Sequence, residues 1–134
     1  MNYQEAIDSI SAVFNAAWNP AYPVKWDDLP GDPPNTEIPW AKFHVQHTDG
    51  RLSSLGGGKL LRKWHREGVI VGQVFAPAGQ GKTLAVSLGQ VVVDAYQTAS
   101  TEIQYRNVQL VEFGTDGAFY RVDIYANFDY DDVR

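Results

Sequence analysis

The chain has 134 residues, of which 44% are hydrophobic and 13% aromatic, and its formal net charge is −5. This composition indicates one globular domain over residues 1–134 and argues against global disorder. The acidic balance argues against a dedicated nucleic-acid binder, and the absence of cysteine from the sequence excludes disulfides and thiolate zinc sites.

Neither a membrane segment nor an export signal is expected from the sequence. No run approaches the roughly 18 apolar residues that a spanning helix needs, and Met1–Glu5 lacks a basic region followed by an apolar core. We therefore expect neither membrane insertion nor export, and the absence of cysteine fits assembly in a reducing cytoplasm.

The first half of the chain predicts one helix and one or two strands. Apolar side chains recur at helical spacing from Tyr3 to Trp18, and Asn19-Pro20 ends that pattern. Six of the seven prolines fall between Pro20 and Pro39, which indicates a surface excursion with a short strand at Val24–Trp26. Strict alternation over Trp40–His47 then predicts a half-buried strand.

Next comes a polar, glycine-rich stretch, Thr48–Gly58, for which we expect a long mobile loop that orders against a partner. A basic patch leads out of this loop. It is followed by the apolar run Val69–Ala76, which predicts a central strand. The patch consists of Lys59, Arg62, Lys63 and Arg66.

The last part of the chain predicts a helix and a hairpin. Apolar residues at helical spacing run from Leu84 to near Ala99. Strands Ile103–Phe113 and Ala118–Phe128 follow, joined across Gly114–Gly117, and the even-numbered side chains of the second are expected to face the helices. The acidic end, Asp129–Arg134, is expected to fray. The resulting fold class is α+β, a mainly antiparallel sheet packed against two helices, with a long mobile loop.

A loose phosphate-loop pattern occurs at Ala76–Thr83, read as APAGQGKT. Pro77 removes one backbone N–H from it, and the only apolar run ending in aspartate, Val91–Asp94, lies on the helix itself rather than on a neighbouring parallel strand. We therefore interpret the glycines as a strand-to-helix turn, with nucleotide binding as an unfavoured alternative.

The sequence gives only weak indications of a metal site or of a catalytic nucleophile. His44 and His47 are three apart on a strand, so their side chains point to opposite faces and do not share an ion with His65. Ser87 lacks a nucleophile elbow. We expect no catalytic residues, no cofactor and no metal.

The order of elements resembles the tail terminator proteins of long-tailed double-stranded DNA phages. The likeness covers nearly the whole chain. It rests on the helix Tyr3–Trp18, the proline-rich segment ending in Pro39–His47, the strand and turn GVIVGQVFAPAGQGK, the helix Leu84–Tyr96 and the closing hairpin VQLVEFGTDGAFYRVDIYANFDYDD.

The resemblance implies a structural virion protein. Such proteins form a six-membered ring on the finished tail tube, stop its polymerisation and present a surface for head joining. The implied partners are further copies of the chain, the major tail tube protein and a head–tail connector protein. DNA is expected to pass through the ring without specific binding. Another ring-forming connector or tail completion protein is the nearest alternative.

A head-to-tail ring needs two different patches on each subunit. The sequence offers a basic segment, Lys59–Arg66, and acidic segments at Asp27–Asp32 and Asp129–Asp132, with exposed aromatics Trp40, Trp64 and Tyr130 as apolar contacts. The full set of interface candidates is Arg51, Leu52, Leu55, Lys59, Arg62, Lys63, Trp64, Arg66, Asp129, Asp131 and Asp132.

Overall fold

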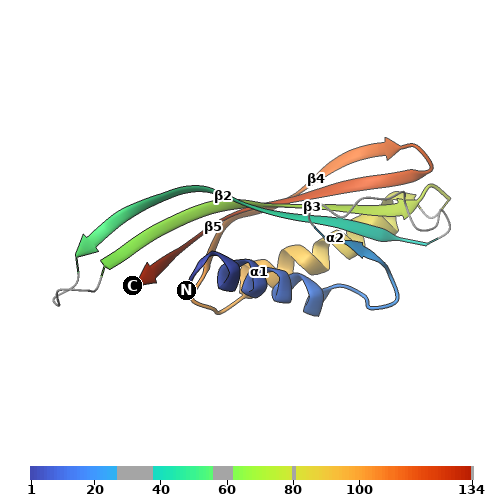
Figure 1. Ribbon diagram of the computed structural model, residues 1–134. Coiled ribbons are helices and arrows are strands. Elements are labelled where there is room, and N and C mark those ends of the chain that lie inside the picture. The colour runs from blue at the N-terminus through green and yellow to red at the C-terminus, as the bar shows by residue number, and fades with distance from the viewer. Residues whose placement is uncertain (27–37, 56–61, 80, 134) are drawn as a thin grey trace.

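The computed structural model describes residues 1–26, 38–55, 62–79 and 81–133, with backbone only at 52–55. Within these residues, two helices and five strands follow one another (Figure 1). In chain order they are α1 (Tyr3–Ala17), β1 (Val24–Lys25), β2 (Trp40–Leu55), β3 (Arg62–Pro77), α2 (Gly81–Thr98), β4 (Gln104–Asp116) and β5 (Phe119–Val133).

The strands form one sheet in the order β1-β2-β3-β5-β4. Only the short β1–β2 pair is parallel, and the other three pairs are antiparallel. Both helices lie on the same face of this long, twisted sheet (Figure 1). The structure thus confirms the predicted α+β class, the N-terminal helix and the helix after the central strand.

Strand register decides which side chains meet the helices. Along β5 the even-numbered residues from Val122 to Asp132 are at most 3% exposed, which confirms the face predicted for those up to Phe128. They stand opposite even-numbered residues of β3, which in turn stand opposite odd-numbered residues of β2 up to His47. The alternate set of side chains forms a second face without a helix, here called the open face (Figure 1).

The core lies between the helices and the sheet. Asn2 caps α1, its side chain accepting from Glu5 N at 2.8 Å while Glu5 Oε1 accepts from Asn2 N at 3.1 Å. One helical face then buries Ala6, Ile10 and Phe14 against the sheet. The other helix is tied to the first by a hydrogen bond that the Tyr96 hydroxyl donates to the Ile10 carbonyl at 2.7 Å, which satisfies a buried polar group.

Two predictions about strand length are wrong. The segment Thr48–Leu55 is part of β2 rather than a mobile loop; the remaining part of that prediction, 56–58, lies outside the described residues. The end of the chain does not fray either, because β5 continues through Asp129 to Val133. A register shift between His47 and Asp49 breaks the alternation in the sequence, which explains why the continuation was missed.

The centre of the sheet contains a glycine, Gly68, at which the backbone leaves no room for a side chain. A Cβ at this position would overlap the ring of Phe128 and the backbone carbonyl of Gln46, whereas a Cβ at Gly72 would meet Ile124 Cβ at an ordinary 3.5 Å. We expect Gly68→Ala to lower the free energy of unfolding by about 3 kcal/mol, because a carbonyl in a strand cannot move away.

The matched control is Gly72→Ala, which is expected to change the free energy of unfolding by less than about 1 kcal/mol. Urea unfolding of both variants measures the difference. Equal losses at the two positions would contradict the close approach of Phe128 and Gln46 to Gly68.

Candidate functional site

The hairpin of β2 and β3 projects beyond the ends of both helices (Figure 1). Its described part, here called the arm, comprises 48–55 of β2 and 62–67 of β3, and the end of β5 runs alongside β3. Most of the interface candidates lie here. Arg51, Leu52 and Leu55 are in β2, Arg62, Lys63, Trp64 and Arg66 in β3, and Asp129, Asp131 and Asp132 in β5, while Lys59 lies outside the described residues.

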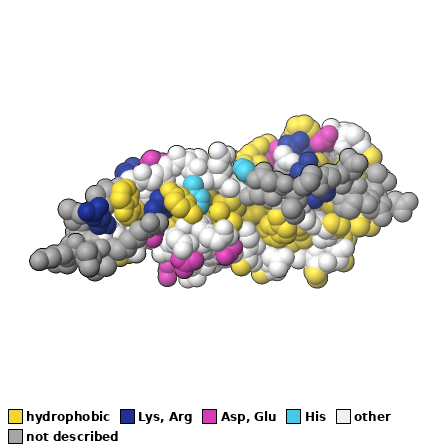
Figure 2. Space-filling view, viewed as in Figure 1, with side chains coloured by type: hydrophobic (Ala, Val, Ile, Leu, Met, Phe, Trp, Pro, Cys, Tyr) yellow, Lys and Arg dark blue, Asp and Glu magenta, His cyan; other side chains and the backbone are white. Residues whose placement is uncertain are grey.

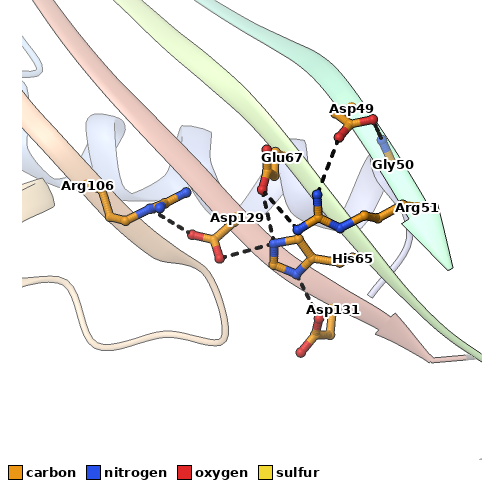
Figure 3. A network of polar contacts seen from close by, with 8 residues as sticks. All are labelled: Asp49, Gly50, Arg51, His65, Glu67, Arg106, Asp129 and Asp131. Atoms are coloured by element: carbon orange, nitrogen blue, oxygen red, sulfur yellow. Dashed lines mark hydrogen bonds and ion pairs between the residues drawn. The ribbon is translucent and has the colours of Figure 1, made fainter. Parts of the chain in front are cut away.

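On the open face of the arm, one histidine is surrounded by three carboxylates (Figure 3). His65 Nδ1 lies 3.0 Å from Asp131 Oδ1, and His65 Nε2 lies 3.4 Å from both Glu67 Oε1 and Asp129 Oδ2. Neighbouring strands put these groups together, because His65 pairs with Asp131 and Glu67 with Asp129 in the ladder.

Cations surround this cluster and balance its charge. Lys63 Nζ lies 3.2 Å from Asp131, Arg106 Nε 3.3 Å from Asp129, and one Arg51 nitrogen 3.9 Å from Glu67. The hydrogen bond with His65, then the contact with Lys63, holds the pKa of the Asp131 carboxyl below its usual value. The outer pair of Lys63 and Asp131 is 47% and 41% exposed, so it contributes little to stability, whereas His65 and Asp129 at the centre of the cluster are only 21% and 14% exposed.

The opposite face of the arm holds a buried ion pair. Arg66 and Asp132 are 7% and 3% exposed, and two guanidinium nitrogens lie 3.2 and 3.1 Å from Asp132 Oδ2. Arg66 also donates to the Tyr3 hydroxyl and stacks over the Tyr3 ring at 4.1 Å. This cluster, here called the lock, joins the start of α1 to β3 and to the end of β5.

The structure changes how the predicted patches are understood. The basic segment and the acidic end were expected to form separate surfaces, one for each neighbour in a ring. They lie instead in adjacent strands and neutralise each other within one subunit, through Lys63–Asp131 on the open face and Arg66–Asp132 on the covered face. Of the aromatics expected to be exposed, Trp40 and Tyr130 are buried, at 2% and 3% exposure. The other acidic segment, 27–32, lies outside the described residues.

Sequence reasoning missed the partners in both clusters. Tyr3 was assigned to the apolar face of the first helix, Glu67 was not singled out, and His65 was considered only as a metal ligand. The available signal was the two-residue alternation of charge in β3 and β5, which becomes informative only when the strand is extended to Val133. Among the described residues, no group of three or more potential ligands is arranged to hold a metal ion.

A second polar cluster lies on the open face near the β4–β5 turn. Arg121 Nε and Nη2 donate to the two oxygens of Asp123 at 2.7 and 3.0 Å, and the Tyr125 hydroxyl donates to the same carboxylate at 3.1 Å. Asp123 is only 3% exposed. Substitution of Arg121 would therefore leave a buried carboxylate without its cation.

His47, on the helix-covered face, makes stability depend on pH. Burial first, and then the charge of Arg66, lowers the pKa of His47 from 6.5, and its Nε2 lies 2.7 Å from the Tyr130 hydroxyl. The folded state therefore binds this proton less well than the unfolded state. The stabilising contribution is present above about pH 6.5 and is lost as pH falls through the lowered value.

We expect the free energy of unfolding to be smaller at pH 5.5 than at pH 7.5, and His47→Gln to reduce this difference. Gln46→Ala, at an exposed position without an ionisable group in the same strand, should leave the difference unchanged. Urea titrations at the two pH values measure it, and a pH dependence that is unaltered in His47→Gln would contradict the assignment.

The strands around the glycine turn after β3 are not arranged as they are around a phosphate-binding loop. Both neighbours of β3 run antiparallel to it, and Lys82 Nζ lies 3.2 Å from Glu112 Oε1. A phosphate loop requires a parallel neighbour whose end carries the metal-binding carboxylate.

No protein-family model matches the sequence, and no curated protein matches it. Among solved structures, one chain with a name that states no function is 20% identical and has a TM-score of 0.58. The match covers 95% of this chain and 94% of that one. It shows a shared fold over the full length and carries no information about activity. In the described part of the chain, no helix is long and apolar enough to cross a membrane.

Proposed function

We propose that this chain is a structural assembly protein that closes the tail tube of a long-tailed phage. Copies of it form a ring on the tube, end tube polymerisation and present the surface to which the head joins. The sequence resemblance supports this proposal, as does the α+β fold with two helices on one face of the sheet.

The observation that carries the proposal is the long uncovered sheet face with large apolar side chains near its edge. Antiparallel sheets often leave one face in water, so an open face alone does not specify a partner. Here Val111, Phe113 and Tyr125 are 41%, 54% and 36% exposed on or beside that face. Exposed apolar groups gathered in one region are typical of protein contact surfaces.

The arm supports the same role. It extends the sheet beyond the helices, and the lock and the open-face network hold its base in place. A projecting hairpin whose cations Arg51, Lys63 and Arg66 are paired with carboxylates of the same subunit suits contact with an adjacent protein ring better than attraction of a charged small molecule. We propose the major tail tube protein and a head–tail connector as its partners, and the finished virion as its location.

Electron microscopy of purified tail tubes tests this proposal. Added protein should form a ring at one end of each tube and stop further addition of tube subunits. Tubes that continue to grow in the presence of the protein would overturn the proposal. Gene order separates the nearest alternative, another connector protein, because a terminator gene is expected just before the gene for the major tail protein.

A nucleotide-binding function is the contrasting class. We expect ATP with magnesium to show no saturable binding. Both neighbours of β3 are antiparallel to it, so no parallel strand ends beside the turn with a carboxylate for magnesium. Isothermal titration measures this directly, and micromolar binding abolished by Lys82→Ala would favour the nucleotide hypothesis.

A further inference from the structure

We propose that the first turn of α1 braces the base of the arm at neutral pH and detaches from it when His47 gains a proton. The brace is formed by Tyr3, whose ring contacts both the His47 ring of β2 and the Arg66 guanidinium of β3. The switch lies within one chain and does not require the proposed ring, so the failure of either leaves the other standing.

Aromatic rings from two other elements pack against His47. The Tyr3 ring of α1 is nearly perpendicular to it, with the ring centroids 4.6 Å apart and the planes at 82°. From β5, the rings of Phe128 and Tyr130 make similar edge contacts at 5.3 and 5.7 Å, and the Tyr130 hydroxyl lies 2.7 Å from His47 Nε2. A charged imidazole in this setting is less well solvated than it is in water.

The charges around His47 belong to the lock. Arg66 acts electrostatically on His47, and its guanidinium lies over the Tyr3 ring and donates to the Tyr3 hydroxyl. The carboxylate of the lock, Asp132, is paired with Arg66 at 3.1 Å and also lies 3.6 Å from the Met1 amino group. A proton on His47 therefore adds a cation beside Arg66, while the carboxylate is already engaged.

The closed brace favours the neutral form of His47. Burial first, and then the charge of Arg66, lowers the pKa of this histidine from its ordinary value of 6.5. By linkage, protonation favours any state in which the ring meets water. The brace is therefore closed above about pH 6.5 and opens as pH falls through the lowered pKa.

Protons can reach this histidine while the brace is closed. The His47 side chain is only partly buried. Figure 2 shows histidine, basic and hydrophobic side chains adjoining one another on the visible surface where the projecting end meets the body of the molecule. Protonation therefore does not require prior unfolding of the domain.

The start of α1 is the part of this arrangement that can yield. His47 and Arg66 are both held in the β2–β3 ladder, so their backbones cannot separate without breaking the sheet. Tyr3 is 44% exposed, whereas Ile10, two turns further along the helix, is 0% exposed in the core. Detachment of one turn hydrates His47, removes the brace from the arm and leaves the core in place.

Backbone order parameters of the full chain, measured by NMR at pH 7.5 and pH 5.5, test the switch. The amide of Glu5 reports on the first turn, because it donates to the Asn2 side chain that caps the helix. The amide of Val93 reports on the buried face of α2. In acid the order parameter of Glu5 should fall below about 0.6, while that of Val93 stays near about 0.85.

Two histidine variants assign the effect. His47→Gln should keep the first turn ordered at both pH values, because no proton is gained. His65→Gln is the matched control, since it removes the histidine on the open face of the arm and leaves His47 in place, and it should loosen in acid as the unsubstituted protein does. Loosening in His47→Gln, or none in His65→Gln, would overturn the proposal.

The unsubstituted protein gives a second test that does not depend on how well a variant folds. The pH midpoint at which Glu5 loses order should coincide with the midpoint at which the His47 ring itself titrates. A first turn that stays ordered at pH 5.5 would contradict the switch. Loss of order that spreads to Val93 would also contradict it, because the whole domain would then be unfolding.

Discussion

Val122→Asp should unfold the protein at room temperature. Val122 is 0% exposed and stands near the start of β5, opposite Val74 and beneath the helices. An aspartate there would bury an unpaired charge, and we expect a loss of more than about 4 kcal/mol. The whole free energy of unfolding of a domain is only about 5–15 kcal/mol. Circular dichroism and urea unfolding measure the effect.

The control uses the same chemical change at an exposed valine. Val91 lies on α2 with 51% of its surface exposed, so Val91→Asp should cost less than about 1 kcal/mol. Arg121, on the opposite side of β5, is not a suitable control position, because it pairs with the buried Asp123. Similar losses in the two valine variants would mean that the assignment of β5 faces is wrong.

Asp132→Ala is expected to have the second largest effect, about 3–5 kcal/mol, because it leaves the buried Arg66 guanidinium without its carboxylate. Asp131→Ala is the matched control. It removes the same group one residue earlier, from a side chain that is 41% exposed on the other face, and should cost no more than about 1 kcal/mol.

Replacing both members of the ion pair separates the charge from the packing. The double variant Arg66→Met with Asp132→Leu should recover much of the stability that Asp132→Ala loses, since the buried guanidinium and carboxylate are removed together. The Met1 amino group, 3.6 Å from Asp132 Oδ1, loses its partner in both variants. Urea unfolding of the four proteins measures these effects. If Asp132→Ala and Asp131→Ala were equally mild, the end of β5 would not be anchored as described.

The fold was largely predictable because its apolar periodicity is strong. Alternation in Trp40–His47 and in the even-numbered residues of β5, and helical spacing in α1 and α2, gave the element types and the buried faces. The arm was not predictable by the same means. Its buried positions include a charged pair, Arg66 and Asp132, so a pattern of hydrophobic residues ends where the strand continues.

The charged interface patches were also not predictable from the sequence pattern. Charges read along the chain suggested two complementary patches, because sequence separation was taken as separation in space. The antiparallel β3–β5 ladder places Lys63, His65 and Asp131 side by side, which turns an intermolecular hypothesis into an intramolecular network. The order of the strands in the sheet is likewise not specified by the local pattern of the sequence.

Tail length in phage particles made without this gene tests the proposed function most directly. If the protein ends tube polymerisation, its loss should give headless tails of uncontrolled length under the electron microscope, and a plasmid copy should restore uniform tails. Tails of normal, uniform length joined to heads in the absence of the protein would contradict its role as the cap of the tail tube.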